Sequence, residues 1–149
     1  ERTTLKCNMG DTALLISHAL ATRGIVSQEL YQQLTLGKLE VNEGMLIENM
    51  VAQMLVAGGH KLFFYSRYDE KNADNRMEID FLVQKPTITS RHNISPIEVK
   101  SSNRYTLTSI NKYIKKYGNY LGTPYVLHSA DLRVENGIVF LPLYMTPFL

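Results

Sequence analysis

The hydrophobic period of this sequence changes at Gly58-Gly59, and this change constrains the fold more than any other feature. Before the two glycines, apolar residues recur at helical spacing over residues 43–57, and Asn42 stands where a helix N-cap is expected. Five apolar residues are predicted to form the inward face of this helix: Ile47, Met50, Val51, Met54 and Leu55. After the glycines, aromatic or alternating residues predict three antiparallel strands, at residues 61–68, 77–83 and 94–100.

The segment before this helix predicts a strand that leads into two helices. Residues 5–9 alternate between apolar and polar side chains like a short strand. A helix is expected at residues 12–20 with Asp11 as its N-cap, and a second helix at residues 27–36. Together these elements form a β-α-α extension, which we assign to residues 1–40.

Helical spacing returns after the three strands, over residues 106–121. Its apolar residues are predicted to face inward: Leu107, Ile110, Ile114, Tyr117 and Leu121. Residues 123–128 predict a buried strand, and residues 134–139 predict a turn into a last strand that ends at Pro142. The core, assigned to residues 42–141, therefore has the order α-β-β-β-α-β with one further strand, a mixed central sheet flanked by helices. The expected fold class is α/β (α+β).

Composition limits the number of domains and the kinds of partner. A chain of 149 residues with 44% hydrophobic and 20% charged residues is expected to form one globular domain. No apolar run approaches the roughly 20 residues of a membrane span, and the single cysteine, Cys7, suits a reducing cytoplasm. The net charge of only +2 permits a nucleic-acid partner without favouring one. Because Glu1 opens the sequence without an initiator Met or a signal peptide, we expect a fragment of a longer protein.

Four ionisable residues occur where a purely structural sequence would more readily place neutral ones: Glu48, Asp80, Glu98 and Lys100. Side chains alternate along a strand, so Glu98 and Lys100 are expected to project together while Ile97 and Val99 enter the core. In the preceding strand the odd positions are expected to face the core: Met77, Ile79, Phe81 and Val83. Asp80 then lies on the opposite face, beside Glu98 if the strands are neighbours.

Two such carboxylates need a cation between them. At about 4 Å they repel by roughly 4 kcal/mol at an effective dielectric near 20. Mg²⁺ is the natural candidate because it prefers hard oxygen ligands and fills its octahedron with water and substrate phosphate. Lys100 is then placed to hold or deprotonate a metal-bound water, and Glu48 borders the buried face of its helix within reach of the same sheet end. The alternative is a solvated strand face with an ordinary cross-strand charge pair.

A helix Glu, Ile-Asp on a hairpin strand and Glu-x-Lys on the next strand, in this order, resemble the PD-(D/E)XK nuclease superfamily, which has the restriction-endonuclease-like fold. The closer resemblance is to the carboxy-terminal nuclease-like domain of a largely uncharacterised family of prokaryotic AAA+-type ATP-binding proteins. Three segments carry it: residues 44–55, 77–82 and 97–101. Residues 9–15 are similar to the opening Asp-Thr-Gly-Leu-Leu element of that domain, with Ala13 in place of the usual Gly, so the resemblance spans nearly the whole chain.

The resemblance implies a catalytic set of Asp80, Glu98, Lys100 and Glu48. It implies Asp80, Glu98 and the Val99 carbonyl as ligands of Mg²⁺ or Mn²⁺, with Ile79 replacing the superfamily's leading proline. It also implies an upstream ATPase domain in the same polypeptide. The sequence itself has no ATP site, since Gly37-Lys38 lacks the remaining residues of a P-loop.

The expected function is a Mg²⁺-dependent, nuclease-like domain of a cytoplasmic ATP-binding protein that hydrolyses phosphodiester bonds, with DNA as the expected substrate. Four basic residues interleaved with tyrosines are the predicted nucleic-acid-binding set: Arg104, Lys112, Lys115 and Lys116. The alternative function is a catalytically inactive module that binds nucleic acid or its own ATPase partner, because the superfamily also includes domains that have lost the reaction.

Overall fold

The computed structural model describes residues 5–21, 28, 32, 42–84, 94–102 and 104–149. Its helices are α1 (Thr12–Ala21), α3 (Glu43–Ala57) and α4 (Thr108–Tyr117), and its strands are β1 (Phe63–Arg67), β2 (Met77–Gln84), β3 (Ile94–Val99), β4 (Tyr125–His128), β5 (Arg133–Glu135) and β6 (Ile138–Pro142). Three 3-10 segments join them: η1 (Ala73–Asn75), η2 (Gly118–Tyr120) and η3 (Leu143–Phe148). The helix predicted at residues 27–36 lies outside the described residues, apart from two isolated positions.

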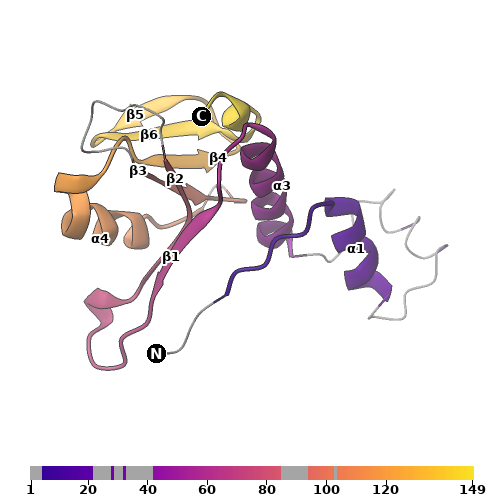
Figure 1. Cartoon of the computed structure of the whole chain (residues 1–149), viewed down its shortest axis with the longest axis horizontal. Coiled ribbons are helices and arrows are strands. Elements are labelled where there is room, and N and C mark those ends of the chain that lie inside the picture. Colours follow the sequence, from indigo (N-terminus) through magenta and orange to yellow (C-terminus); the bar gives the residue numbers. More distant parts are fainter. Residues whose placement is uncertain (1–4, 22–27, 29–31, 33–41, 85–93, 103) are drawn as a thin grey trace.

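The six strands form one mixed sheet in the order β1-β2-β3-β4-β6-β5 (Figure 1). The pairs β1–β2 and β2–β3 are antiparallel, as predicted, whereas β4 pairs in parallel with both β3 and β6. The fold is therefore a mixed α+β architecture, which confirms the predicted class and is compatible with the expected nuclease-like core. Among the described residues, we find no helix of the length and apolarity that a membrane crossing requires.

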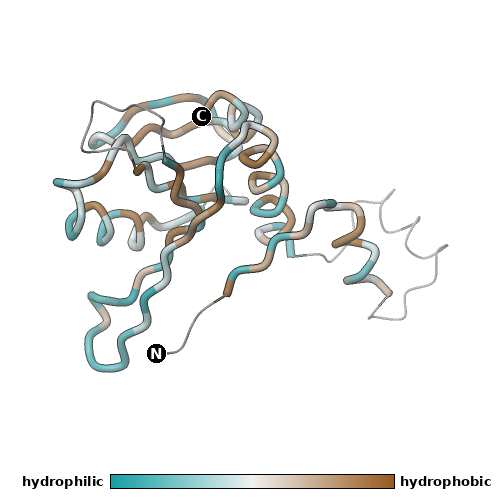
Figure 2. Tube along the Cα trace, in the orientation of Figure 1, coloured by the Kyte–Doolittle hydropathy of each residue, from teal (hydrophilic) through white to brown (hydrophobic). Residues whose placement is uncertain are grey.

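Helices cover both faces of this sheet. Val51 and Leu55 of α3 are fully buried in a core that includes Phe81 and Ile97. On the other face, α4 places Ile110 and Tyr113 in a second core. Figure 2 shows hydrophobic stretches in the central strands and a hydrophilic loop at residues 69–75. Because both faces are covered at β3, its charged residue Glu98 is buried.

The predicted limits of α3 are confirmed. The Asn42 side chain accepts a hydrogen bond from the Met45 amide at 3.2 Å, which satisfies one free N–H group of the first turn. Gly59 ends the helix at a φ of +86°, a conformation that glycine adopts without the strain of a Cβ atom. One detail of the inward face was wrong: Met50 is 47% exposed, and Ala52 is buried in its place.

The chain before α1 differs from the prediction. Asp11 caps α1 as expected, since its Oδ1 accepts the Ala13 and Leu14 amides. The strand predicted at residues 5–9 is wrong, because this segment pairs with no strand in the described part of the chain. The backbone of this segment is instead hydrogen-bonded to α3, where Asn49 Oδ1 accepts a hydrogen bond from the Met9 amide at 2.7 Å. The alternating pattern thus marks an extended segment that lies along a helix.

The carboxyl-terminal part of the structure agrees with the prediction from the sequence except in two details. The predicted turn is confirmed at Asn136-Gly137, where both residues have positive φ angles of 50° and 76° as in a tight hairpin turn. The turn also joins β6 to a short strand, β5, that the sequence did not predict. The helix expected to extend to residue 121 ends at Tyr117 and continues as the 3-10 segment η2, which begins at Gly118.

Buried His128 ends β4 within a small polar network. Its Nδ1 lies 3.4 Å from the Tyr105 hydroxyl, which accepts a hydrogen bond from Arg133, and its Nε2 lies 3.2 Å from the Asp131 carbonyl. These partners fit a neutral ring with the proton on Nε2. Burial, followed by the nearby Arg133 charge, lowers the pKa of His128 below its ordinary value.

This network predicts a loss of stability in mild acid. An unfolded histidine takes up its proton near pH 6.5, so the unfolded state binds more protons than the native state below that pH. We expect the free energy of unfolding in urea to decrease from pH 7.5 to 5.5, with a smaller decrease in His128→Gln than in wild type. His18→Gln, at an exposed position, is the control and should keep the wild-type dependence. Identical pH dependence in wild type and His128→Gln would contradict this account.

Candidate functional site

A β-bulge in β2 positions the first acidic residue of the site. Phe63 pairs with Leu82 but Tyr65 pairs with Ile79, so one residue of β1 lies opposite Asp80 and Phe81 of β2. The extra residue interrupts the alternation of side chains along β2. The prediction that the odd positions of β2 share one core was therefore wrong: Met77 and Ile79 join the α4 core, and Phe81 and Val83 join the α3 core.

Asp80 lies where β2 and β3 separate. The ladder between the two strands ends at the pair Phe81 and Ile97. Just beyond it, Asp80 Oδ2 accepts a hydrogen bond from the Val99 amide at 2.8 Å, in place of a backbone partner. This bond fixes the carboxylate at the split and leaves its other oxygen for a cation.

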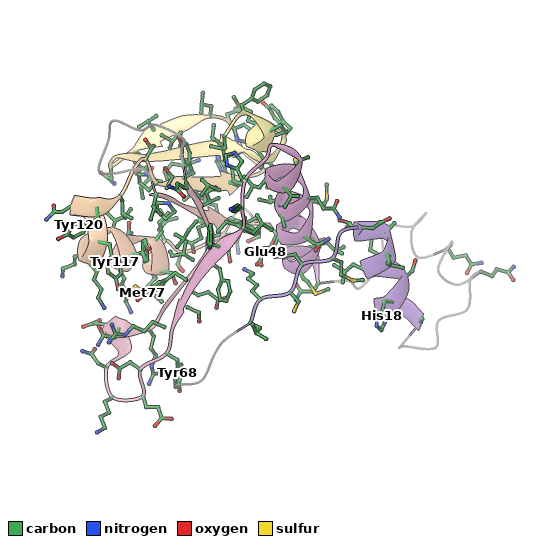
Figure 3. All side chains as sticks on the ribbon, in the orientation of Figure 1. His18, Glu48, Tyr68, Met77, Tyr117 and Tyr120 are labelled. Carbon is green, nitrogen blue, oxygen red and sulfur yellow. The ribbon has the colours of Figure 1, made fainter. Side chains whose placement is uncertain are left out.

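Lys6 supplies that cation from the N-terminal segment. Its Nζ lies 3.1 Å from Asp80 Oδ1 and 2.9 Å from Glu48 Oε2, so one ammonium joins the two carboxylates. It also lies 5.4 Å from the centre of the Phe81 ring. Figure 3 shows Glu48 on the side of α3 next to this segment. Burial lowers the pKa of the Lys6 ammonium, but Asp80 and Glu48 outweigh it and raise the pKa above its ordinary value.

Glu98 and Lys100 form a second ion pair. Glu98 lies opposite Val126, a residue of the α4 core, and is only 6% exposed. Lys100 Nζ donates to Glu98 Oε1 at 2.6 Å, whereas Oε2 is buried without a hydrogen-bond partner in the described part of the protein. Burial raises the pKa of the Glu98 carboxyl; Lys100 opposes this rise and the charge of Asp80 adds to it. Glu98 thus points away from the α3 core, as expected, but it enters the α4 core instead of solvent.

The four residues predicted from the sequence therefore form two pairs. Glu48 and Asp80 share an ammonium, and Glu98 bonds to Lys100. Within residues 5–21, 28, 32, 42–84, 94–102 and 104–149, no three acidic, histidine or cysteine side chains are grouped to hold one metal ion. Val99 contacts Asp80 through its amide; the role of its carbonyl as a ligand stays a prediction.

The donor set still fits a magnesium ion. Mg²⁺ is commonly held by only one or two carboxylates, with water and substrate phosphate completing its octahedron. Asp80 and Glu48 already share one positive charge, and the unpartnered Glu98 Oε2 belongs to the adjacent strand. These are the oxygens that would hold the metal ion.

The predicted nucleic-acid-binding residues have mixed surroundings. Lys112 donates to the Ala73 carbonyl at 2.7 Å, which ties α4 to the loop between β1 and β2. Lys116 Nζ lies 5.4 Å from the centre of the Tyr117 ring, which Figure 3 shows on α4. Arg104 and Lys115 are exposed. Lys112 thus has a structural contact, and contact of any of the four with nucleic acid stays a prediction.

Sequence reasoning missed two residues of the site. The alternating pattern of residues 5–9 predicts Lys6 in a strand, whereas its side chain reaches Asp80 across 74 positions of the chain. Asn49 follows Glu48 on α3 and is 2% exposed, with its side chain bonded to Met9 and Thr12. A buried asparagine in the middle of a helix is a signal of a tertiary contact that the sequence does offer.

Comparison with known proteins gives one match. A protein-family model described as "Domain of unknown function (DUF4143)" matches residues 43–145, which is more than half of the chain. No curated protein and no solved structure matches this chain.

The buried Glu98–Lys100 pair gives a stability prediction. Lys100→Met leaves the Glu98 carboxylate buried without its cation, which costs roughly 3–5 kcal/mol in such pairs. We expect this loss in the free energy of unfolding in urea, and recovery of most of it in Lys100→Met/Glu98→Gln. Lys115→Met, at an exposed position, is the control and should change stability by less than about 0.5 kcal/mol. A single Lys100→Met variant as stable as wild type would contradict a buried ion pair.

Proposed function

The chain belongs to the DUF4143 family of domains of unknown function, and from its own residues we propose a Mg²⁺-dependent nuclease-like domain of the PD-(D/E)XK type. The reaction is hydrolysis of a phosphodiester bond, with DNA as substrate. One observation carries the proposal: Glu48 and Asp80, from a helix and a bulged strand, share a single cation where β2 and β3 separate. The Glu98–Lys100 pair of the adjacent strand supports it.

Asp80 and Glu48 would hold the metal ion, with Glu98 as a third oxygen donor after a change of its side-chain rotamer. When bound, the ion supplies Lewis-acid stabilisation of a phosphoryl oxygen and lowers the pKa of a water molecule. The Val99 amide keeps Asp80 oriented through its bond to Oδ2, so the other carboxylate oxygen faces the cation. This preorganisation reduces the entropy lost when metal and substrate bind.

Lys100 is the residue that would bind the reacting phosphate or the attacking water. Its ammonium is now bonded to Glu98 Oε1 at 2.6 Å and is partly exposed. If Glu98 turns to a metal ion, Lys100 loses this acceptor, and a non-bridging phosphate oxygen or the attacking water replaces it. The exposed Arg104, Lys115 and Lys116 provide charges for more distant phosphates.

The remaining predictions from the sequence are part of this proposal. An upstream ATPase domain of the same polypeptide is the proposed partner, and the cytoplasm is the proposed location. Residues 1–40 act as an extension of a core at residues 42–141, and ATP binds outside this chain.

The alternative is a non-catalytic interaction module with the same fold. Two observations favour it: Lys6 already neutralises Glu48 and Asp80, and the net charge is only +2. Duplex-binding domains are commonly more basic. If this alternative holds, we expect the domain either to bind a partner protein or to bind DNA in a salt-sensitive way, without a metal requirement.

The test is cleavage of plasmid, linear duplex and single-stranded DNA with Mg²⁺ or Mn²⁺, and with EDTA. We expect metal-dependent products from wild type. Asp80→Asn and Glu98→Gln should reduce the rate by about 100-fold or more, since metal stabilisation of the transition state is worth several kcal/mol.

Asp74→Asn is the matched control, because Asp74 is an exposed acid of the same hairpin and should leave the rate unchanged. Circular dichroism checks that each variant is folded. Equal rates in wild type and Asp80→Asn would sink the nuclease proposal. So would the absence of cleavage by folded wild type under every metal condition; salt-dependent DNA binding measured by fluorescence anisotropy would then support the alternative.

A further inference from the structure

The N-terminal segment is tied to α3 close to the acidic pair. The Met9 amide donates to Asn49 Oδ1 at 2.7 Å, and Gln53 Nε2 donates to the Met9 carbonyl at 3.3 Å. Asn49 Nδ2 in turn donates to Thr12 Oγ1 at 3.1 Å. These three bonds anchor Met9 and Thr12 to α3, chiefly at Asn49, the residue next to Glu48. They bring the residues just before Met9 to the metal-binding carboxylates.

Lys6 is the inward-pointing residue of this tether. Leu5, Cys7 and Asn8 are exposed, whereas the Lys6 side chain is only 18% exposed between Glu48 and Asp80. Only Cys7 and Asn8 separate Lys6 from the anchored Met9, so the ammonium has a high effective concentration at the carboxylates. An ion pair held this way is more favourable than one between free partners.

The ammonium occupies the position that a divalent ion needs. Its nitrogen lies 2.9 Å from Glu48 Oε2 and 3.1 Å from Asp80 Oδ1, so the oxygens available for a shared ligand already face a cation. The other oxygen of Asp80 is bonded to the Val99 amide. A metal ion and the ammonium cannot both be bound there, because like charges at such short range repel.

We propose that Lys6 is a tethered competitor of the metal ion, so the N-terminal segment guards the site and a divalent cation binds only by displacing the ammonium. This inference rests on the proposed metal site. It assigns the segment before α1 a regulatory role: whatever draws residues 5–8 away from α3 increases the metal affinity of the domain. The bonds of Met9 to Asn49 and Gln53 do not involve Lys6 and so permit its release without loss of the anchor.

The test compares the affinity for Mn²⁺ alone in wild type and Lys6→Met by isothermal titration calorimetry. Methionine keeps the length and apolar stem of lysine but removes the charge. We expect Lys6→Met to bind Mn²⁺ at least about tenfold more tightly, which corresponds to about 1.4 kcal/mol. Its melting temperature should be below that of wild type without metal, because two carboxylates then repel, and should recover in saturating Mn²⁺.

Three further proteins complete the experiment. Lys71→Met, at an exposed position in the hairpin loop, is the charge-matched control and should bind Mn²⁺ as wild type does. Lys6→Gln provides a second neutral variant if Lys6→Met does not fold. Asp80→Asn identifies the site and should lose the binding.

The outcomes separate the two claims. Equal Mn²⁺ affinity in wild type and the neutral Lys6 variants, with binding lost in Asp80→Asn, overturns the competition and leaves the proposed metal site intact. Weaker binding in the Lys6 variants also overturns it. No Mn²⁺ binding by wild type, Lys6→Met or Lys6→Gln overturns the metal site and the competition together.

Discussion

The ion triad of Lys6, Glu48 and Asp80 is the interaction on which the arrangement of the site depends. Its three members come from an extended segment, a helix and a bulged strand, so it joins the N-terminal segment to α3 and to β2. Two carboxylates in a partly desolvated position need a cation, and the chain provides one of its own. The proposed metal ion would meet the same requirement, and the proposed function and the proposed competition by Lys6 both follow from it.

Coverage of the sheet on both faces explains the second half of the site. β3 is a central strand between β2 and β4, and α3 and α4 pack on opposite faces. Glu98 is therefore buried, and its carboxylate is stabilised by Lys100 at Oε1, with a smaller contribution from the backbone of Ile110. A buried carboxylate with one unpartnered oxygen is costly for a purely structural residue. This cost is consistent with a residue retained for chemistry.

The sequence predicts the elements of this protein better than it predicts their contacts. Signals that depend on local backbone chemistry predict the structure well. The Asn42 N-cap, the helix end at Gly58-Gly59 and the Asn136-Gly137 turn are all present. The four residues that the sequence singles out do form ion pairs in the structure, although only Asp80 and Glu98 lie on strands; their role as a site stays a prediction. The bulge at Asp80 was not, since register is set by pairing with β1 and not by the local pattern. Lys6 could not be found either, because an ion pair across 74 positions leaves no periodic signal.

The most direct test of the central claim is an anomalous difference map from crystals of the protein grown with Mn²⁺. The account predicts a peak between Asp80 and Glu48, within about 2.0–2.6 Å of their carboxylate oxygens, with the Lys6 ammonium displaced from its present position. A crystal saturated with Mn²⁺ in which Lys6 still joins the two carboxylates, and no peak lies beside Asp80, would contradict it.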